Sequence, residues 1–159
     1  MIPKEDSKFL RKAIELSARH SHDGIHGPFG AVIVKDGKII AEGWNEVLKT
    51  NDPTAHAEIV AIRNACRYLG TWDLGGTTIY SSCEPCPMCL GAIYWAKISR
   101  VVFAANRNDA TKAGFSDEHI YREIEIPHDI RMVEFVQHLR DEAVEVLEKW
   151  TENETRKMY

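Results

Sequence analysis

The chain lacks the features that mark several large classes of protein. It has no run approaching the ~18 apolar residues of a membrane span, and its first residues, MIPKEDSKFLRKA, contain no apolar stretch that could act as a signal peptide. We therefore expect a cytoplasmic protein with no membrane partner. No internal repeat, low-complexity tract or linker interrupts the 159 residues, so we predict a single domain, residues 1–159.

The chain also has no excess of basic residues over acidic ones. The chain carries 20 Lys and Arg against 24 Asp and Glu, a formal net charge of −4. Domains whose main partner is a phosphate backbone usually carry a basic stripe. We therefore expect no nucleic-acid partner.

Cysteine is scarce but concentrated. Of the four cysteines, Cys83, Cys86 and Cys89 lie within seven residues of one another. In a reducing compartment such a cluster binds metal or takes part in catalysis more often than it forms crosslinks. Cys-x-x-Cys spacing allows two thiolates to hold one zinc ion, or allows a redox pair. This segment alone leaves both interpretations open.

The hydrophobic pattern predicts alternating helices and strands. Asp36-Gly37 indicates a hairpin between the first two strands, and Gly70 marks the end of a helix. The order predicts a mixed sheet with helices on both faces and a parallel part. The expected helices are 5–20, 55–69, 86–96 and 138–150, the expected strands are 29–34, 38–44, 77–81, 100–105 and 132–136, and 45–54 is an expected loop.

A histidine far from the cysteines completes a metal-binding pattern. One imidazole, from His56, and two thiolates, from Cys86 and Cys89, would hold zinc and leave a tetrahedral position for water. Both ligand sets stand at predicted helix N-termini, which favour thiolate over thiol. Glu58 lies two residues after His56, where a carboxylate can carry protons between the water and a leaving group. The pairing of His-x-Glu with Pro-Cys-x-x-Cys is the signature of zinc nucleoside and nucleobase deaminases.

Other uses of the same residues remain open. Cys83 could add a fourth ligand and close a structural zinc site, as in a zinc-stabilised interaction module without catalysis. A Cys86–Cys89 redox pair would leave His56 and Glu58 without a role. We expect Cys83 to lie behind the ligands, because Glu84 and Pro85 separate it from the predicted helix.

Four segments of the chain carry a further resemblance: GPFGAVIVKDGKIIAEGWN, NDPTAHAEIVAIRNAC, SCEPCPMCLGAIYWA and AGFSDEHIY. Together they resemble the short bacterial guanine deaminases of the cytidine deaminase-like superfamily. The zinc motif is diagnostic for the superfamily, whereas Ala113 to Asp117, Ile120-Tyr121 and the terminal Tyr159 point to guanine. Ser116 stands where this family often has a second acidic residue.

The resemblance implies a fold, an assembly and a reaction. The fold would be a three-layer α/β/α sandwich around a five-stranded mixed sheet. The protein would be a homodimer with one Zn²⁺ per subunit, and residues 138–159 would form a C-terminal helix and tail that cover an active site, in the same or the partner subunit. The reaction would be hydrolysis of guanine to xanthine and ammonia, a step of purine catabolism or salvage.

The resemblance also implies substrate contacts. Asp117 and the carboxylate of Tyr159 would accept from the N–H groups of guanine, and the Asn45 amide would bond the polar edge of the ring. Phe29 would form a wall against the ring, and the Ala57 N–H would donate toward the reacting centre. The alternatives are deamination of another base or nucleoside, such as guanosine or cytosine, and deamination of adenosine in tRNA.

Overall fold

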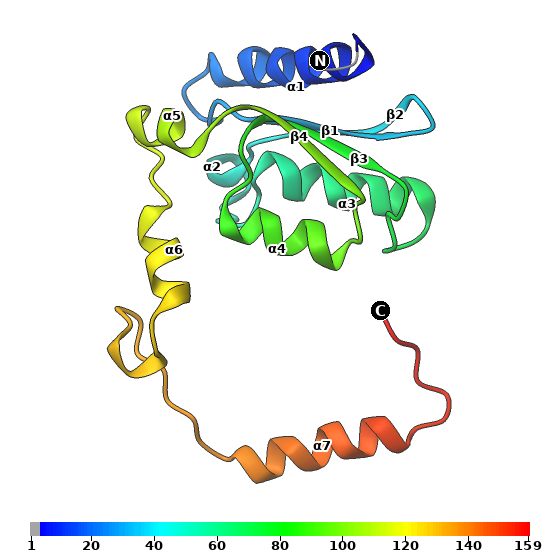
Figure 1. Ribbon diagram of the computed structural model, residues 1–159, viewed down its shortest axis with the longest axis vertical. Coiled ribbons are helices and arrows are strands. Elements are labelled where there is room, and N and C mark those ends of the chain that lie inside the picture. The colour runs from blue at the N-terminus through cyan, green and yellow to red at the C-terminus, as the bar shows by residue number, and fades with distance from the viewer. Residues whose placement is uncertain (1–3) are drawn as a thin grey trace. The chain divides into compact units, whose positions relative to one another are not determined.

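The computed structural model describes residues 4–159 of the chain (Figure 1). Residues 1–3, which the predicted single domain also includes, lie outside the described part. The elements are α1 (Lys4–Ser21), β1 (Gly30–Lys35), β2 (Lys38–Trp44), α2 (Val47–Thr50), α3 (Ala57–Leu69), β3 (Thr78–Cys83), α4 (Pro87–Trp95), β4 (Arg100–Ala105), α5 (Arg107–Lys112), α6 (Glu118–Glu125), a 3₁₀ turn (His128–Ile130) and α7 (Arg140–Glu152).

A mixed sheet forms the centre of the first part of the chain, with the strand order β2-β1-β3-β4. β1 runs antiparallel to β2 and to β3, whereas β3 and β4 are parallel. Asp36 and Gly37 have φ values of 49° and 71°, the left-handed backbone that a two-residue hairpin turn requires. Helix α1 covers one face of the sheet, and α3 and α4 cover the other (Figure 1). The predicted α/β class with helices on both faces is confirmed.

Each face of the sheet has its own apolar core. The core beneath α3 and α4 contains Ile33, Leu74, Ile79 and Ile93, and the core beneath α1 contains a smaller group around Leu16. Because Ile79 and Tyr80 are neighbours on β3 but belong to different cores, the period-two alternation of a strand assigns their side chains to opposite faces. This alternation determines which β3 side chains reach the elements that carry the predicted metal ligands.

Gly43 brings α3 close to the sheet. A Cβ at this position would lie 2.3 Å from the carbonyl oxygen of Ala57 and 2.5 Å from the backbone nitrogen of Ala61. Only glycine permits this approach of the β2 backbone to the first turn of α3. The position of His56, which directly precedes that turn, therefore depends on Gly43.

Three details differ from the expected elements. Among residues 4–159 the sheet has four strands rather than five, and 132–136 is not a strand. Met132, Val133 and Val136 are 84%, 68% and 76% exposed, so an apolar, β-prone run without a neighbouring strand does not extend the sheet. The expected loop 45–54 contains the short helix α2, and Asn51 in the left-handed conformation ends it.

The chain divides into two compact units, Met1–Asp117 and Glu118–Tyr159. The sheet, α1, α3 and α4 belong to the first unit. The second contains α6, the 3₁₀ turn, α7 and the C-terminal tail, and neither α6 nor α7 has a buried residue. The expectation that 138–159 cover an active site concerns this second unit and stays a prediction. No helix within 4–159 is long and apolar enough to cross a membrane.

Candidate metal centre and active site

Two helix N-termini of the first unit carry the predicted metal ligands. His56 is the N-cap of α3 and Cys86 the N-cap of α4, both with extended backbone and neither with a capping bond from its side chain. Cys86 thus precedes the first turn instead of lying within it as expected, because Pro87 takes the first helical position. The imidazole and the thiol are therefore available for a metal.

The ligand atoms have the separations of a zinc site. His56, Cys86 and Cys89 offer ligand atoms that all lie within 4.8 Å of one another. Nδ1 of His56 lies 3.5 Å from Sγ of Cys86 and 3.6 Å from Sγ of Cys89. Zn–N and Zn–S bonds of ordinary length at a tetrahedral angle put nitrogen and sulfur about 3.6 Å apart. The three residues therefore fit zinc and leave its fourth position open.

The two thiols of this cluster compete for one proton. A hydrogen bond with Cys89, and another with His56, lower the pKa of Cys86 to about 4. The hydrogen bond to the Cys86 thiolate and burial raise the pKa of Cys89. The bond with Cys86 also raises the pKa of His56. Two thiolates and a neutral imidazole exist together here only when a cation replaces these protons.

Glu58 lies beside the ligands without belonging to them. Its side chain is 6% exposed. Oε1 accepts a 3.0 Å hydrogen bond from Oγ of Ser81, and Oε2 accepts one of 3.5 Å from Sγ of Cys89. Burial raises the pKa of Glu58. A carboxyl group with a raised pKa beside an open metal position suits proton transfer.

Ser81 is a site residue that the sequence interpretation missed. It lies on β3, is 1% exposed and bonds to Glu58 on the α3 side of the sheet. The available signal was its spacing of two from Ile79 and from Cys83, which places all three on one face of a strand. A hydroxyl in that buried row requires a polar partner, and Glu58 provides it.

Cys83 is not a member of the ligand group found among residues 4–159. Its Sγ donates to the carbonyl oxygen of Asn106 at 3.7 Å. Burial, with a contribution from the charge of Glu58, raises its pKa to about 11, so it remains a thiol. The structure therefore offers three protein ligands, and the closed four-ligand site has no support in the described residues.

Asn45 and Ala57 are both buried, with exposures of 8% and 0%, and Ala57 directly follows the metal ligand His56. Oδ1 of Asn45 accepts hydrogen bonds from the backbone N–H of Gly27 at 3.3 Å and of Val47 at 3.4 Å. Ala57 is the first residue of α3, a position whose N–H has no carbonyl partner inside the helix.

Phe29 and Asp117 belong to the same unit as the metal cluster. The Phe29 ring meets the Phe115 ring edge to face, with centroids 4.9 Å apart. Burial raises the pKa of Asp117, and negative charge on Cys86 adds to this rise. Asp117 therefore lies within electrostatic range of Cys86. Tyr159 belongs to the second unit, and its place in the site stays a prediction.

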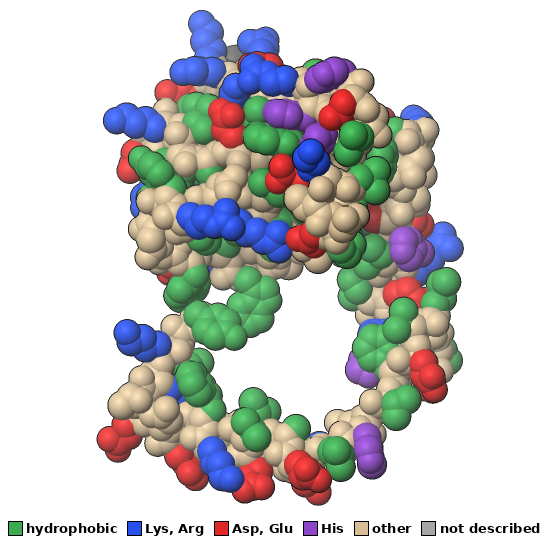
Figure 2. Space-filling view, turned by 180° about the vertical axis from the view of Figure 1, so that it is seen from behind, with side chains coloured by type: hydrophobic (Ala, Val, Ile, Leu, Met, Phe, Trp, Pro, Cys, Tyr) green, Lys and Arg blue, Asp and Glu red, His purple; other side chains and the backbone are tan. Residues whose placement is uncertain are grey.

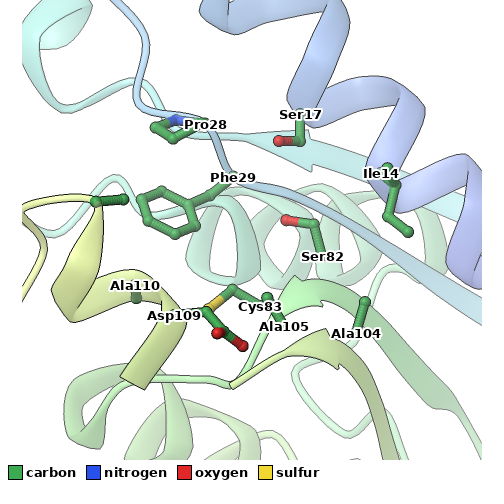
Figure 3. Close-up of a pocket in the computed structure, with 11 residues that line it drawn as sticks. Ile14, Ser17, Pro28, Phe29, Ser82, Cys83, Ala104, Ala105, Asp109 and Ala110 are labelled. Atoms are coloured by element: carbon green, nitrogen blue, oxygen red, sulfur yellow. The ribbon is translucent and has the colours of Figure 1, made fainter. Parts of the chain in front are cut away.

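A cavity of about 340 Å³ lies next to Phe29, between α1, the ends of β3 and β4, and α5 (Figure 3). Of the predicted site residues only Phe29 lines it, and no metal ligand does. The cavity is therefore separate from the metal ligands. Its walls are Ile14, Ser17, Pro28, Phe29, Ser82, Cys83, Ala104, Ala105, Asp109, Ala110 and Ala113.

Known proteins resemble this chain in sequence and in fold. The chain is 51% identical over 151 residues to a guanine deaminase of Bacillus subtilis, covering 95% of this chain and 97% of that protein. The X-ray structure of guanine deaminase from Bacillus subtilis matches with a TM-score of 0.93 and 50% identity, covering 96% of this chain and 98% of the other. A tRNA-specific adenosine deaminase of Buchnera aphidicola is 35% identical over 96% of this chain and 98% of its own length.

The match to a protein family covers the elements that build the metal centre. Residues 3–105 match the cytidine and deoxycytidylate deaminase zinc-binding region. This span includes the sheet, α3 and α4, and with them His56, Glu58, Cys86 and Cys89. The expected cytidine deaminase-like fold is confirmed by the high structural similarity above. The chain belongs to the cytidine and deoxycytidylate deaminase family of zinc-binding enzymes.

Proposed function

We propose that this protein is a zinc-dependent hydrolase that converts guanine and water to xanthine and ammonia. The observation that carries the proposal is the position of the buried Glu58 carboxylate beside a three-ligand metal site. The choice of guanine is supported by the 51% identity to a guanine deaminase over 95% of the chain.

The residues of the site divide the chemical work. His56, Cys86 and Cys89 would hold zinc, which would supply a Lewis acid that lowers the pKa of water. Glu58 would take one proton from a water molecule and deliver it to the ring nitrogen whose double bond to C2 opens as the water oxygen bonds to C2. Glu58 would then take the second proton from that oxygen and pass it to the exocyclic nitrogen, whose bond to C2 breaks as ammonia leaves and the C2 carbonyl of xanthine forms.

Recognition of guanine requires acceptors for its N1–H and 2-amino groups. Asp117, together with the terminal carboxylate of Tyr159, provides such acceptors in our proposal. The amide of Asn45 and the N–H of Ala57 bond the remaining polar atoms, and the ring of Phe29 packs against the base. The electrostatic coupling between Asp117 and Cys86 supports this role for Asp117.

A homodimer is part of the proposal. Helix α4 carries no acidic or basic residue in its sequence PMCLGAIYW, and Tyr94 and Trp95 on it are 76% and 68% exposed. In α7, Val146 and Leu147 are 67% and 64% exposed, and Figure 2 shows hydrophobic side chains along the C-terminal segment. Apolar surface of this extent usually marks an interface, and a second copy of the chain is the partner that we propose. Sedimentation equilibrium tests it: a dimer mass supports the proposal, and a monomer at micromolar concentration contradicts it.

The adenosine of a tRNA anticodon is a second candidate substrate, because a tRNA-specific adenosine deaminase is 35% identical over 96% of the chain. The net charge of −4 argues against it, since tRNA binding relies on neutralising phosphates. Our proposal therefore includes no nucleic-acid partner.

One panel of substrates tests the function. Zinc content is measured first, and ammonia release is then followed with guanine, guanosine, cytosine, adenine and a tRNA with adenosine at the wobble position. We expect one zinc ion per subunit and release of ammonia from guanine. Absence of ammonia from guanine with the zinc-loaded protein contradicts the proposal, and turnover of the tRNA in its place supports the second candidate.

A further inference from the structure

The side-chain amide of Asn45 has one defined orientation. The backbone N–H of Gly27, which precedes Asn45 in the chain, and that of Val47, which follows it, both point to the same atom of the Asn45 amide, at 3.3 and 3.4 Å. An amide oxygen accepts two hydrogen bonds, whereas the amide nitrogen only donates. The atom between the two N–H groups must therefore be the oxygen, and the NH₂ group is turned away from them.

The NH₂ group of Asn45 is the part left for a ligand. Within residues 4–159, the side-chain hydrogen bonds of Asn45 all end on Oδ1. The residue is nevertheless 92% buried, with an exposed fraction of 8%. Its backbone joins both sides of the site, because Asn45 N–H donates to the carbonyl of Phe29 at 3.1 Å and Glu46 N–H donates to the carbonyl of Ala55, next to His56, at 2.9 Å. The backbone that carries the Asn45 NH₂ group is thus bonded to Phe29, the proposed ring wall, on one side and to the residue before the metal ligand His56 on the other.

Gly27 lies so close to the Asn45 amide that an added side chain would press against it. A Cβ at Gly27 would lie 3.1 Å from Cγ, 3.3 Å from Oδ1 and 3.4 Å from Nδ2 of Asn45. The loop cannot easily withdraw, because Asp23 accepts hydrogen bonds from the N–H groups of Ile25 and His26 at 2.9 and 3.1 Å. The Phe29 N–H also donates to the Gly27 carbonyl at 2.8 Å. An alanine at position 27 would therefore require the amide to shift by a few tenths of an ångström.

We propose that Gly27 is a positioning residue, which together with the Val47 N–H fixes Asn45 so that it presents only N–H donors to the substrate. The inference rests on the proposed function and deepens it. Of the polar atoms of guanine, N1–H and the 2-amino group are donors and cannot bond to Asn45, whereas O6, N7 and N3 are acceptors and can. Asn45 therefore selects a base with an acceptor at one of these positions, and the donors of guanine are left to carboxylates.

The test compares variants against analogues that each lack one acceptor: 2-aminopurine without O6, 7-deazaguanine without N7 and 3-deazaguanine without N3. Their inhibition constants are measured against guanine turnover. The variants are Gly27→Ala and Asn45→Asp, in which a carboxylate keeps the acceptor for both N–H groups but loses the donors. Gly24→Ala is the control for strain in the same loop, because φ at Gly24 is 70°, which disfavours a side chain, while the added Cβ meets nothing within 4 Å.

In the wild type we expect one analogue to bind about tenfold more weakly than guanine, because it lacks the acceptor for the hydrogen bond from Asn45. In Asn45→Asp and in Gly27→Ala this preference disappears, and KM for guanine rises about tenfold while kcat changes less. Gly24→Ala keeps the preference. The inference is overturned if the preference persists in Gly27→Ala or in Asn45→Asp, or if Asn45→Asp keeps the wild-type KM. Should Gly27→Ala fail to fold, Asn45→Asp still decides whether the Asn45 donors bind the substrate. The wild-type rate on guanine tests the proposed function separately.

Discussion

Ser81 holds one oxygen of the Glu58 carboxylate through a 3.0 Å hydrogen bond from its Oγ to Oε1. The other oxygen accepts from Sγ of the metal ligand Cys89 at 3.5 Å. The carboxylate thus lies between β3 and α4. Because Cys89 gives up its proton as a zinc ligand, the Ser81 hydroxyl is the donor that orients the carboxylate toward the open metal position.

Replacing Ser81 by Ala should therefore lower kcat for guanine about tenfold, because Glu58 loses the donor that orients it. KM and the zinc content should stay close to those of the wild type. Steady-state kinetics with metal analysis measures both. Ser82→Ala is the control, since the Ser82 hydroxyl accepts from the Gly30 N–H on the other face of β3. That variant should lose stability and keep kcat, whereas an unchanged kcat in Ser81→Ala would contradict the role of Ser81.

The three-ligand site predicts different results for two neighbouring cysteines. Cys86→Ser should lose most of its zinc and with it the deaminase activity, because a hydroxyl does not ionise to replace the thiolate. Cys83→Ala should keep one zinc ion per subunit, since Cys83 lies outside the ligand group of the described residues. Metal analysis after dialysis against a chelator makes the comparison. Loss of zinc from Cys83→Ala would revive the closed structural site.

Acid should weaken the fold through Asp6. Hydrogen bonds from Arg100, at 2.7 Å to each oxygen, and from Tyr80, also 2.7 Å, lower the pKa of Asp6 to about 2. A pKa that is lower in the folded state gives stability above the unfolded value of about 4, and this stability is lost as the pH falls from there to 2. Urea unfolding between pH 5 and 2 should show a smaller loss for Asp6→Asn and Arg100→Gln than for the wild type. An equal loss of unfolding free energy with falling pH in the wild type and in both variants would contradict this prediction.

Removal of the last residue tests the proposed contact from the C-terminus. Deleting Tyr159 moves the terminal carboxylate by one position, so KM for guanine should rise about tenfold. Replacement of Tyr159 by Phe keeps that carboxylate and should have a smaller effect. Kinetics on guanine compares them. Unchanged turnover in the deletion variant would remove Tyr159 from the site.

Much of the fold was predictable because its signals are local. Asp36-Gly37 indicates the hairpin from adjacent residues, and Gly70 marks the end of α3, where the structure finds it in the left-handed conformation. The fifth strand was not predictable, because a strand needs a partner from elsewhere in the chain. The apolar character of residues 132–136 says nothing about whether such a partner is adjacent.

The spacing of residues in the sequence predicts the metal ligands. It does not predict the residues that hold Glu58 and Asn45 in place. His56, Cys86 and Cys89 match a pattern whose chemistry restricts the residue types. The partners of that pattern, Ser81 to Glu58 and Gly27 to Asn45, are 23 and 18 residues apart, and small or polar side chains have many uses. Only the packing of α3 and the 22–28 loop on the sheet shows which contact each makes.

The Glu58→Gln variant separates proton transfer from metal binding. Ammonia release is compared between the wild type and Glu58→Gln at equal, measured zinc content. We predict ammonia from guanine with the wild type and a rate about 10³-fold lower with Glu58→Gln, with one zinc ion per subunit in both. Equal rates for the two proteins would contradict proton transfer by Glu58, and no ammonia from the zinc-loaded wild type would contradict the deamination of guanine.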